Sequence, residues 1–283
     1  PEQPVDSGLV ACGEIRLRVA SPLGSPGTAS LQAAIAMFET ERISVVIPAF
    51  NEERHVAKVI AGVPGWVDQI VLVDDGSSDG TARVAAAASV PVKIVRHPEN
   101  LGVGAAIATG YRAALEAGAG AVAVMAGDGQ MDPEELASLV APVVAGQADY
   151  SKGDRTTHPL VRARMPAWRR LGNAALSRWT GALTGYRVRD AQCGFTVIGA
   201  SMLRQLRLAS LPDGYGYPNT LLMLLAASGA RVIEVPVTPI YADEGSGLTP
   251  WRALRTHGRL MVRATWRALR DRKSRPTSHA PCP

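Results

Sequence analysis

The chain has little that would hold it together covalently. Its 283 residues include three cysteines, at positions 12, 193 and 282, an odd number of widely separated residues without the spacing of a metal site. A disulfide framework is therefore not expected, and a reducing compartment such as the cytoplasm fits. The sequence also lacks an apolar run long enough to span a bilayer, and no charged-then-apolar signal segment is expected at its start. With 47% hydrophobic residues, the chain can bury one sizeable core, so we expect one domain with appendages.

Acidic residues are scarce at the end of the chain. The formal net charge is +5, but residues 251–283 contain nine Lys or Arg residues and a single acid, a net charge of +8. The rest of the chain therefore carries about −3, and the basic character belongs to the tail. For this reason we do not expect nucleic acid as a partner of the domain.

The tail itself is expected to be an amphipathic helix on an anionic membrane surface. Apolar residues recur at helical spacing, and an arginine follows each of them, an arrangement typical of a helix lying in the lipid interface. The apolar stripe comprises Trp251, Leu254, Gly258, Val262, Trp266 and Leu269. Without a spanning helix, attachment would be peripheral, on the inner face of the membrane. The alternative is a helix packed on its own domain with solvated arginines.

The middle of the chain alternates strand and helix patterns, which predicts a mainly parallel sheet with right-handed crossovers. The expected strands are 43–48, 69–74, 92–95, 121–126 and 232–241. The expected helices are 52–62, 80–88, 103–117, 133–145 and 165–183. In the last helix an apolar stripe that includes Trp168 and Leu171 is expected to face the core. We divide the chain into an N-terminal appendage (1–40), an α/β domain (41–247) and the basic tail (248–283).

Two successive strands end in similar polar turns. Residues 43–53 read ISVVIPAFNEE, and residues 70–81 read IVLVDDGSSDGT. Ligands of open α/β sheets bind beyond the carboxyl ends of the strands, so these turns predict a nucleotide site. An aromatic ring there can stack on a base, and carboxylates can accept from ribose hydroxyls. The candidate residues are Pro48, Phe50, Glu52, Asp74 and Asp75.

A third strand pattern also ends in a polar turn, in residues 121–135, AVAVMAGDGQMDPEE. Asp132 and Pro133 are explained as a helix N-cap and first helical residue. Asp128 lies at the strand end, where an acid has no capping role, and Gln130 follows two residues later. These oxygen ligands predict a site for Mg²⁺ or Mn²⁺ held together with a diphosphate. The alternative is that Asp128 only accepts from a backbone N–H.

Taken together, these segments resemble the family 2 glycosyltransferases of the GT-A fold, and among them the dolichyl- or polyprenyl-phosphate sugar synthases. The resemblance spans roughly residues 43–247. The matching segments, in family order, are PAFNEE, VDDGSSDGT, HPENLGVGAAIATGY, AGDGQMDPEEL, KGDR, DAQCGF and GYGYPNTLL. The resemblance implies an α/β, GT-A-type Rossmann-like fold with a mainly parallel central sheet, followed here by the C-terminal amphipathic basic helix.

The resemblance also assigns residues to the donor. Similar enzymes hold the metal with a D-x-D pair, but here the register gives Ala126, Gly127 and Asp128, so the first acid is missing. Gly127 and Asp128 are nevertheless expected to contact the donor, with Gln130 as a neutral metal ligand. Arg155, in KGDR, matches an arginine that similar synthases place near the phosphates, although a solvated loop charge is the alternative.

The acceptor depends on whether a general base is present. Transfer to a hydroxyl needs one, and in the corresponding segment Asn219 cannot serve. A phosphate monoester is already ionised, so this absence favours a lipid phosphate. Asp190, in DAQCGF, is the competing base, or it orients the acceptor or a loop.

We therefore expect an inverting, metal-dependent glycosyltransferase that moves a sugar from a GDP-mannose- or UDP-glucose-type donor to a polyprenyl or dolichyl phosphate. One alternative is an enzyme of the same fold with a soluble or natural-product hydroxyl acceptor and Asp190 as base. Another is a non-catalytic nucleotide-sugar binding protein. The sequence leaves the oligomeric state open.

Overall fold

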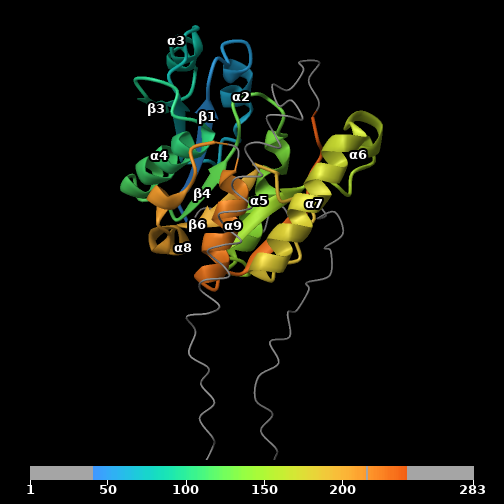
Figure 1. The fold of residues 1–283 in the computed structure, drawn as a ribbon. Helices are drawn as coiled ribbons and strands as arrows, with labels where there is room; N and C mark the ends of the chain where they lie inside the picture. The colour runs from blue at the N-terminus through green and yellow to red at the C-terminus, as the bar shows by residue number, and fades with distance from the viewer. Residues whose placement is uncertain (1–40, 215, 241–283) are drawn as a thin grey trace, which may run out of the picture.

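A computed structural model of the chain describes residues 41–214 and 216–240, which form an α/β fold around one sheet (Figure 1). The strands are β1 (Ile43–Ala49), β2 (Gln69–Asp74), β3 (Val92–Arg96), β4 (Ala121–Val124), β5 (Tyr150–Asp154), β6 (Thr196–Gly199) and β7 (Val232–Pro236). The α-helices are α2 (Val56–Gly62), α3 (Thr81–Ala86), α4 (Val103–Glu116), α5 (Leu136–Val144), α6 (Pro159–Arg164), α7 (Ala167–Thr184), α8 (Ala200–Gln205) and α9 (Tyr217–Ala227). Two short 3₁₀ helices are η1 (Pro133–Glu135) and η2 (Leu208–Ser210).

The seven strands lie in the order β3-β2-β1-β4-β6-β5-β7. All pairings are parallel except those of β6, which runs against both β4 and β5. The segment that leads into β6 therefore lies at the same edge of the sheet as the carboxyl ends of the other strands. This topology brings three predicted site segments, those after β1, β2 and β4, to one edge together with Asp190.

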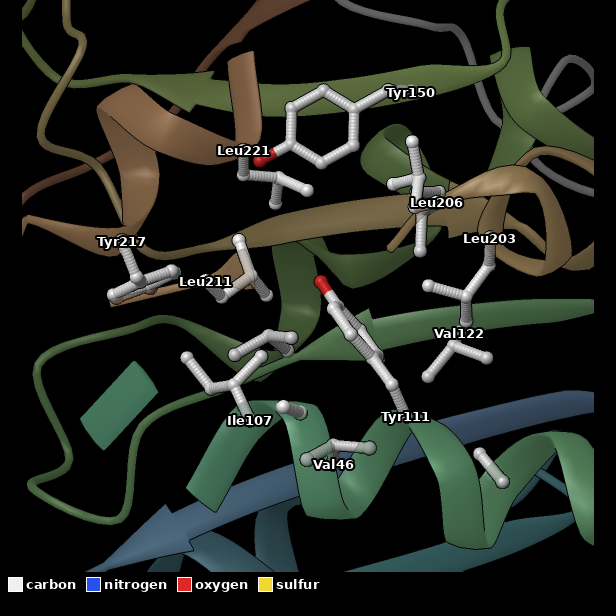
Figure 2. Close-up of a cluster of buried hydrophobic side chains, with 14 of the residues drawn as sticks. Val46, Ile107, Tyr111, Val122, Tyr150, Leu203, Leu206, Leu211, Tyr217 and Leu221 are labelled. Atoms are coloured by element: carbon white, nitrogen blue, oxygen red, sulfur yellow. The ribbon is translucent and has the colours of Figure 1, made fainter. Parts of the chain in front are cut away.

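Helices cover both faces of the sheet because its central strands are apolar on both sides. β1 is buried along its whole length, and its successive residues join different clusters. Val46 packs in the cluster of α4, α8 and α9, whereas Val45 and Ile47 pack in the cluster of α2 and α5. Figure 2 shows the first cluster, in which Tyr111 points from α4 toward the side chains beneath α8 and α9.

The predicted fold class is confirmed, and the predicted strands and helices appear with shifted ends. Strand β4 ends at Val124 and β7 at Pro236, earlier than expected. The short helices α2 and α3 begin later than their patterns suggested, since turns occupy the residues that tie the two site loops together. The appendage (1–40), the loop 241–247 and the basic tail lie outside the described residues.

The expected orientation of α7 is wrong. Its buried residues are Asn173, Ser177 and Thr180, whereas Trp168 and Leu171, expected in the core, are 41% and 72% exposed. The helix turns its polar face inward because the segment beneath it supplies hydrogen-bonding groups rather than an apolar surface. Helical spacing separated the apolar face of this helix from its polar face correctly. The prediction placed the apolar face in the core, whereas it is the polar face that is buried.

Candidate active site

Hydrogen bonds join the loop after β1 to the loop after β2. The Asn51 backbone N–H donates to Ser77 Oγ at 3.0 Å, and the Glu52 N–H donates to Thr81 Oγ1 at 2.8 Å. Asn51 has a positive φ of 57°, a conformation that asparagine tolerates better than most residues. These bonds hold the chain so that Phe50, 44% exposed, lies at the open edge of the sheet. A rigid loop with an exposed aromatic ring suits stacking on a base.

Pro48 is the next-to-last residue of β1 and Asp74 is the last residue of the neighbouring strand β2, and both are buried. Asp74 Oδ1 accepts from the backbone N–H of Ser77 at 2.9 Å. Its Oδ2 lies 3.2 Å from Nε of Arg96 as an ion pair, without the geometry of a hydrogen bond. Asp74 therefore holds the turn in place and balances an arginine on β3.

Asp75 is also buried and holds a loop. Its Oδ1 lies 2.7 Å from Nδ1 of His97 and accepts from the Leu101 N–H at 3.0 Å, and its Oδ2 accepts from the Gly102 N–H at 2.7 Å. Gly102 has a φ of 99°, which a side chain would strain. Asp75 thus fixes the entry to α4, a structural task that the sequence pattern did not reveal.

The loop after β4 packs closely on the end of β1. Gly127 donates its N–H to the Pro48 carbonyl at 3.1 Å, and a Cβ at position 127 would lie 3.1 Å from the Ala49 Cβ. Asp128 therefore follows directly on a well-fixed backbone. Its Oδ1 accepts from the Gln130 N–H at 3.0 Å. Burial raises the pKa of Asp128, although this N–H and the charges of His55 and Arg155 lower it.

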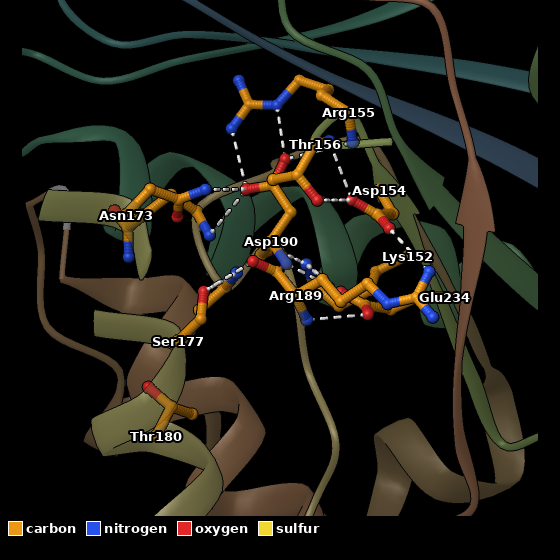
Figure 3. A network of polar contacts seen from close by, with 12 residues as sticks. Lys152, Asp154, Arg155, Thr156, Asn173, Ser177, Thr180, Arg189, Asp190 and Glu234 are labelled. Carbon is orange, nitrogen blue, oxygen red and sulfur yellow. Dashed lines mark hydrogen bonds and ion pairs between the residues drawn. The ribbon is translucent and has the colours of Figure 1, made fainter. Parts of the chain in front are cut away.

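Arg155 and Asp190 form a bidentate pair, shown in Figure 3. Nε of Arg155 donates to Oδ2 at 2.7 Å and Nη2 donates to Oδ1 at 3.0 Å, while Asn173 Nδ2 also donates to Oδ1 at 3.1 Å. Burial by itself would raise the pKa of Asp190. The charge and hydrogen bonds of Arg155, with the charge of Lys152, outweigh it and hold the pKa at about 2. Asp190 is thus a fully ionised and weakly basic carboxylate.

Two charged residues that the sequence analysis did not single out support this pair. Lys152, fully buried on β5, donates from Nζ to the Asp190 carbonyl and lies 3.9 Å from Oε1 of Glu234 on β7. Glu234 accepts from the backbone N–H groups of Arg189 at 2.8 Å and Asp190 at 3.0 Å. The sequence does contain a signal for these two residues, because each is a charged residue within a segment that forms a strand. Their partners could not be predicted, because they lie far away in the sequence.

The inner face of α7 completes the support. Ser177 Oγ donates to the Arg189 carbonyl at 2.9 Å and accepts from the Ala191 N–H at 3.0 Å. Asn219, on α9, donates to Thr180 Oγ1 at 2.6 Å, so it is a buried structural residue.

The residues that surround Asp128 fit a cation only in part. The described residues contain no cluster of three or more His, Cys, Asp or Glu side chains suited to a metal. One carboxylate and the Gln130 amide are nevertheless adequate for Mg²⁺ or Mn²⁺ that keeps waters and binds substrate phosphates, because such ions are often held by one or two carboxylates. The charge of Arg155 also acts on Asp128, so a positive side chain lies near this carboxylate.

The fold is similar to that of solved structures of one enzyme. Glucosyl-3-phosphoglycerate synthase from Mycobacterium tuberculosis, in complex with Mg²⁺ and UDP, has a TM-score of 0.62 at 20% identity, covering 88% of this chain and 86% of that one. The same enzyme with Mn²⁺, UDP and phosphoglyceric acid has a TM-score of 0.60 at 22% identity, covering 87% and 84%. At these identities the likeness concerns the fold.

The family itself is established from the sequence. The model for "Glycosyl transferase family 2" matches residues 44–205, and the chain belongs to this family and is a glycosyltransferase. It is 30% identical over 217 residues to the UDP-N-acetylglucosamine–dolichyl-phosphate N-acetylglucosaminyltransferase of Methanococcus voltae, covering 71% of this chain and 86% of the relative. It is 28% identical over 241 residues to the undecaprenyl-phosphate mannosyltransferase of Micrococcus luteus, covering 82% and 98%.

Proposed function

We propose that this glycosyltransferase moves a sugar, with inversion, from a nucleotide sugar to a polyprenyl phosphate, with Mg²⁺ or Mn²⁺ bound at Asp128 and Gln130. Relatives named for dolichyl, polyprenol and undecaprenyl-phosphate substrates support the acceptor class. The neighbours crystallised with UDP and Mg²⁺ or Mn²⁺ support a nucleotide-sugar donor and a divalent ion.

The observation that supports a phosphate acceptor is the ionised, hydrogen-bonded state of the Asp190 carboxylate. A general base for a sugar hydroxyl works best with a pKa near the operating pH, and a carboxylate with a pKa of about 2 is far from it. Both oxygens of Asp190 also accept hydrogen bonds from Arg155. An acceptor that arrives already ionised, such as a phosphate monoester, does not need this carboxylate as a base.

In the proposed reaction, an acceptor phosphate oxygen attacks the anomeric carbon and the bond to the nucleoside diphosphate breaks. The diphosphate leaves with the bonding electron pair, so negative charge builds up near Asp128. A bound divalent cation would neutralise that charge as a Lewis acid. Arg155 contributes a fixed positive charge that Asp190 orients, and Phe50 stacks on the base. Preorganised charge of this kind stabilises the transition state without a later reorganisation cost.

An acceptor panel tests this function. The purified enzyme would be incubated with UDP- and GDP-sugars, Mg²⁺ or Mn²⁺, and one of three acceptors: a short polyprenyl phosphate in detergent, the matched polyprenol, or phosphoglycerate. We expect transfer to the polyprenyl phosphate alone, and loss of transfer with a chelator. Transfer to polyprenol or phosphoglycerate would contradict the acceptor, and unchanged transfer with the chelator would contradict the metal.

The Asp190→Asn variant tests the role of the carboxylate in the same assay. We expect a lower rate with an unchanged pH profile of kcat/KM, because the variant loses the orientation of Arg155. A loss of a hundredfold or more, accompanied by loss of the acidic limb of the profile, would instead indicate a general base.

A further inference from the structure

Helix α7 carries an apolar face on the outside of the molecule. Leu171 is 72% exposed, Trp168 is 41% exposed, and Ala175 is exposed on the same side of the helix. The neighbouring helix α6 adds Leu160, which is 37% exposed. Helix α6 directly precedes α7 in the chain, and Figure 1 shows both helices on one flank of the molecule. Large apolar side chains that gather at one surface mark an interaction site more often than scattered ones do.

The charge around this face is of one sign. Residues 156–189 contain seven arginines and no Asp or Glu. Arg178 is exposed on the flank of the apolar face, and Arg169 is partly exposed. Trp and Leu beside arginines, on a helix without acidic residues, are the composition of a helix that lies in the interface of an anionic membrane.

We propose that the outward face of α6 and α7, centred on Trp168 and Leu171, docks the enzyme on an anionic lipid surface. The apolar side chains enter the boundary between headgroups and acyl chains, while the arginines meet lipid phosphates. Charge argues against two other occupants, a second copy of the chain and the tail. In a two-fold contact between copies of this face, arginines would meet arginines. The tail, 251–283, carries a net charge of +8 and would be repelled in the same way.

The docking face is directly connected to the proposed site. Asn173 and Ser177, on the opposite side of α7, hold Asp190 and its neighbouring backbone (Figure 3). The membrane would therefore lie one helix away from the Arg155–Asp190 pair, where a lipid phosphate must arrive. The idea that docking brings a lipid phosphate to this pair rests on the proposed function. The docking surface itself is inferred only from the exposed apolar side chains and the charge around them.

Vesicle flotation of the full chain tests the proposal, with phosphatidylcholine vesicles that contain or lack phosphatidylglycerol. Leu171→Glu should weaken binding roughly tenfold, because it places a charge in the inserted face. Val90→Glu is the matched control, since Val90 is 39% exposed on a different surface. Arg178→Glu should weaken binding to anionic vesicles about fivefold or more, whereas Arg204→Glu, exposed on α8, should not.

A second measurement reports how deeply α7 enters the lipid, and it reads out Trp168 rather than the tail. Brominated lipids quench nearby tryptophans, and Trp168→Phe should remove a measurable part of that quenching. Equal flotation of Leu171→Glu and Val90→Glu, together with unchanged quenching in Trp168→Phe, would overturn the proposal. A switch of Leu171→Glu from dimer to monomer in size-exclusion chromatography would do the same, because a second copy would then cover the face.

The assays separate docking from the proposed function. Transfer to a short polyprenyl phosphate in detergent should be the same in Leu171→Glu and the parent, because no vesicle is involved. Failure of the docking proposal would leave that transfer intact. Failure of the acceptor proposal would leave flotation intact.

Discussion

The side chain of Arg155 donates two hydrogen bonds to the carboxylate of Asp190, and the two side chains differ sharply in solvent exposure. Nε and Nη2 reach the two carboxylate oxygens at 2.7 and 3.0 Å. The Asp190 side chain is completely buried, whereas that of Arg155 is 28% exposed. A buried carboxylate thus fixes the direction of an arginine whose side chain reaches the surface. Arginine suits this role because its planar fork matches a carboxylate in two places.

The pair should make stability depend on pH. The pKa of Asp190 is lowered from 3.8 to about 2 in the folded protein. Its contribution is therefore present above pH 3.8 and lost as the pH falls toward 2, and it amounts to about 2 kcal/mol. Asp190→Asn should lower the free energy of unfolding at pH 7 by at least that amount, measured by urea unfolding. The difference between variant and parent should shrink below about pH 3. A constant difference down to pH 2 would contradict the assignment.

The buried Lys152–Glu234 contact should show strong coupling. Removing one partner of a buried charge pair costs about 3–5 kcal/mol, because the other charge stays buried. We expect Lys152→Met to destabilise the protein strongly, whereas Glu234→Gln should cost less, because burial raises the pKa of Glu234 and its charge is itself penalised in the folded protein. The double variant should lose clearly less than the sum of the two, as a double-mutant cycle in urea would measure. Additive losses would mean that the two residues do not interact.

Several features of the fold followed from local sequence. The apolar runs of β1 and β2 predicted buried parallel strands, and parallel strands place their following loops at one edge. Asp128 was predicted at the end of the strand itself, but β4 ends at Val124 and Asp128 lies in the turn that follows it. Each buried strand of such a sheet is a continuous apolar segment, so the pattern of that segment alone is sufficient to predict the strand.

Other features depended on contacts that no single segment encodes. Arg155 and Asp190 are 35 residues apart in the sequence, and their pairing depends on β6 running against β5. The orientation of α7 was wrong because helical spacing defines two faces without stating what each will meet. Asp75 was predicted as a donor ligand, and its hydrogen bonds to the loop before α4 are a structural role that the sequence did not indicate.

Asp128→Asn should separate stability from binding. Because burial raises the pKa of Asp128, its charge destabilises the folded protein above that pKa, and the penalty is present at neutral pH. The variant should therefore be at least as stable as the parent in metal-free buffer, judged by Tm. It should also lose metal-dependent UDP affinity by tenfold or more, measured by calorimetry with Mn²⁺. Gln130→Ala should lose less. Unchanged affinity in Asp128→Asn would remove Asp128 from the site.

Phe50 offers a test of base stacking. Stacking of a nucleobase on an aromatic side chain is worth about 1–3 kcal/mol. Phe50→Ala should thus weaken UDP or GDP binding by at least about fivefold, while stability changes little because the ring is 44% exposed. Leu101→Ala, with a similar exposure of 41%, is the control and should leave nucleotide binding close to that of the parent. Equal affinities of the two variants would mean that the base binds elsewhere.

Because α7 buries its polar face, we expect substitution of a polar residue in this helix to cost more stability than substitution of an apolar one. Ser177→Ala should be the more harmful change, although it removes only one oxygen. It leaves the Arg189 carbonyl and the Ala191 N–H without their partner, and each buried unsatisfied group costs about 1–3 kcal/mol. Leu171→Ala removes a large apolar side chain, but an exposed one, so the cost should stay within about 0.5 kcal/mol. Urea unfolding of the two variants decides the matter. If Leu171→Ala proves to be the costlier change, the apolar face of α7 belongs to the core, and the membrane-docking proposal fails with it.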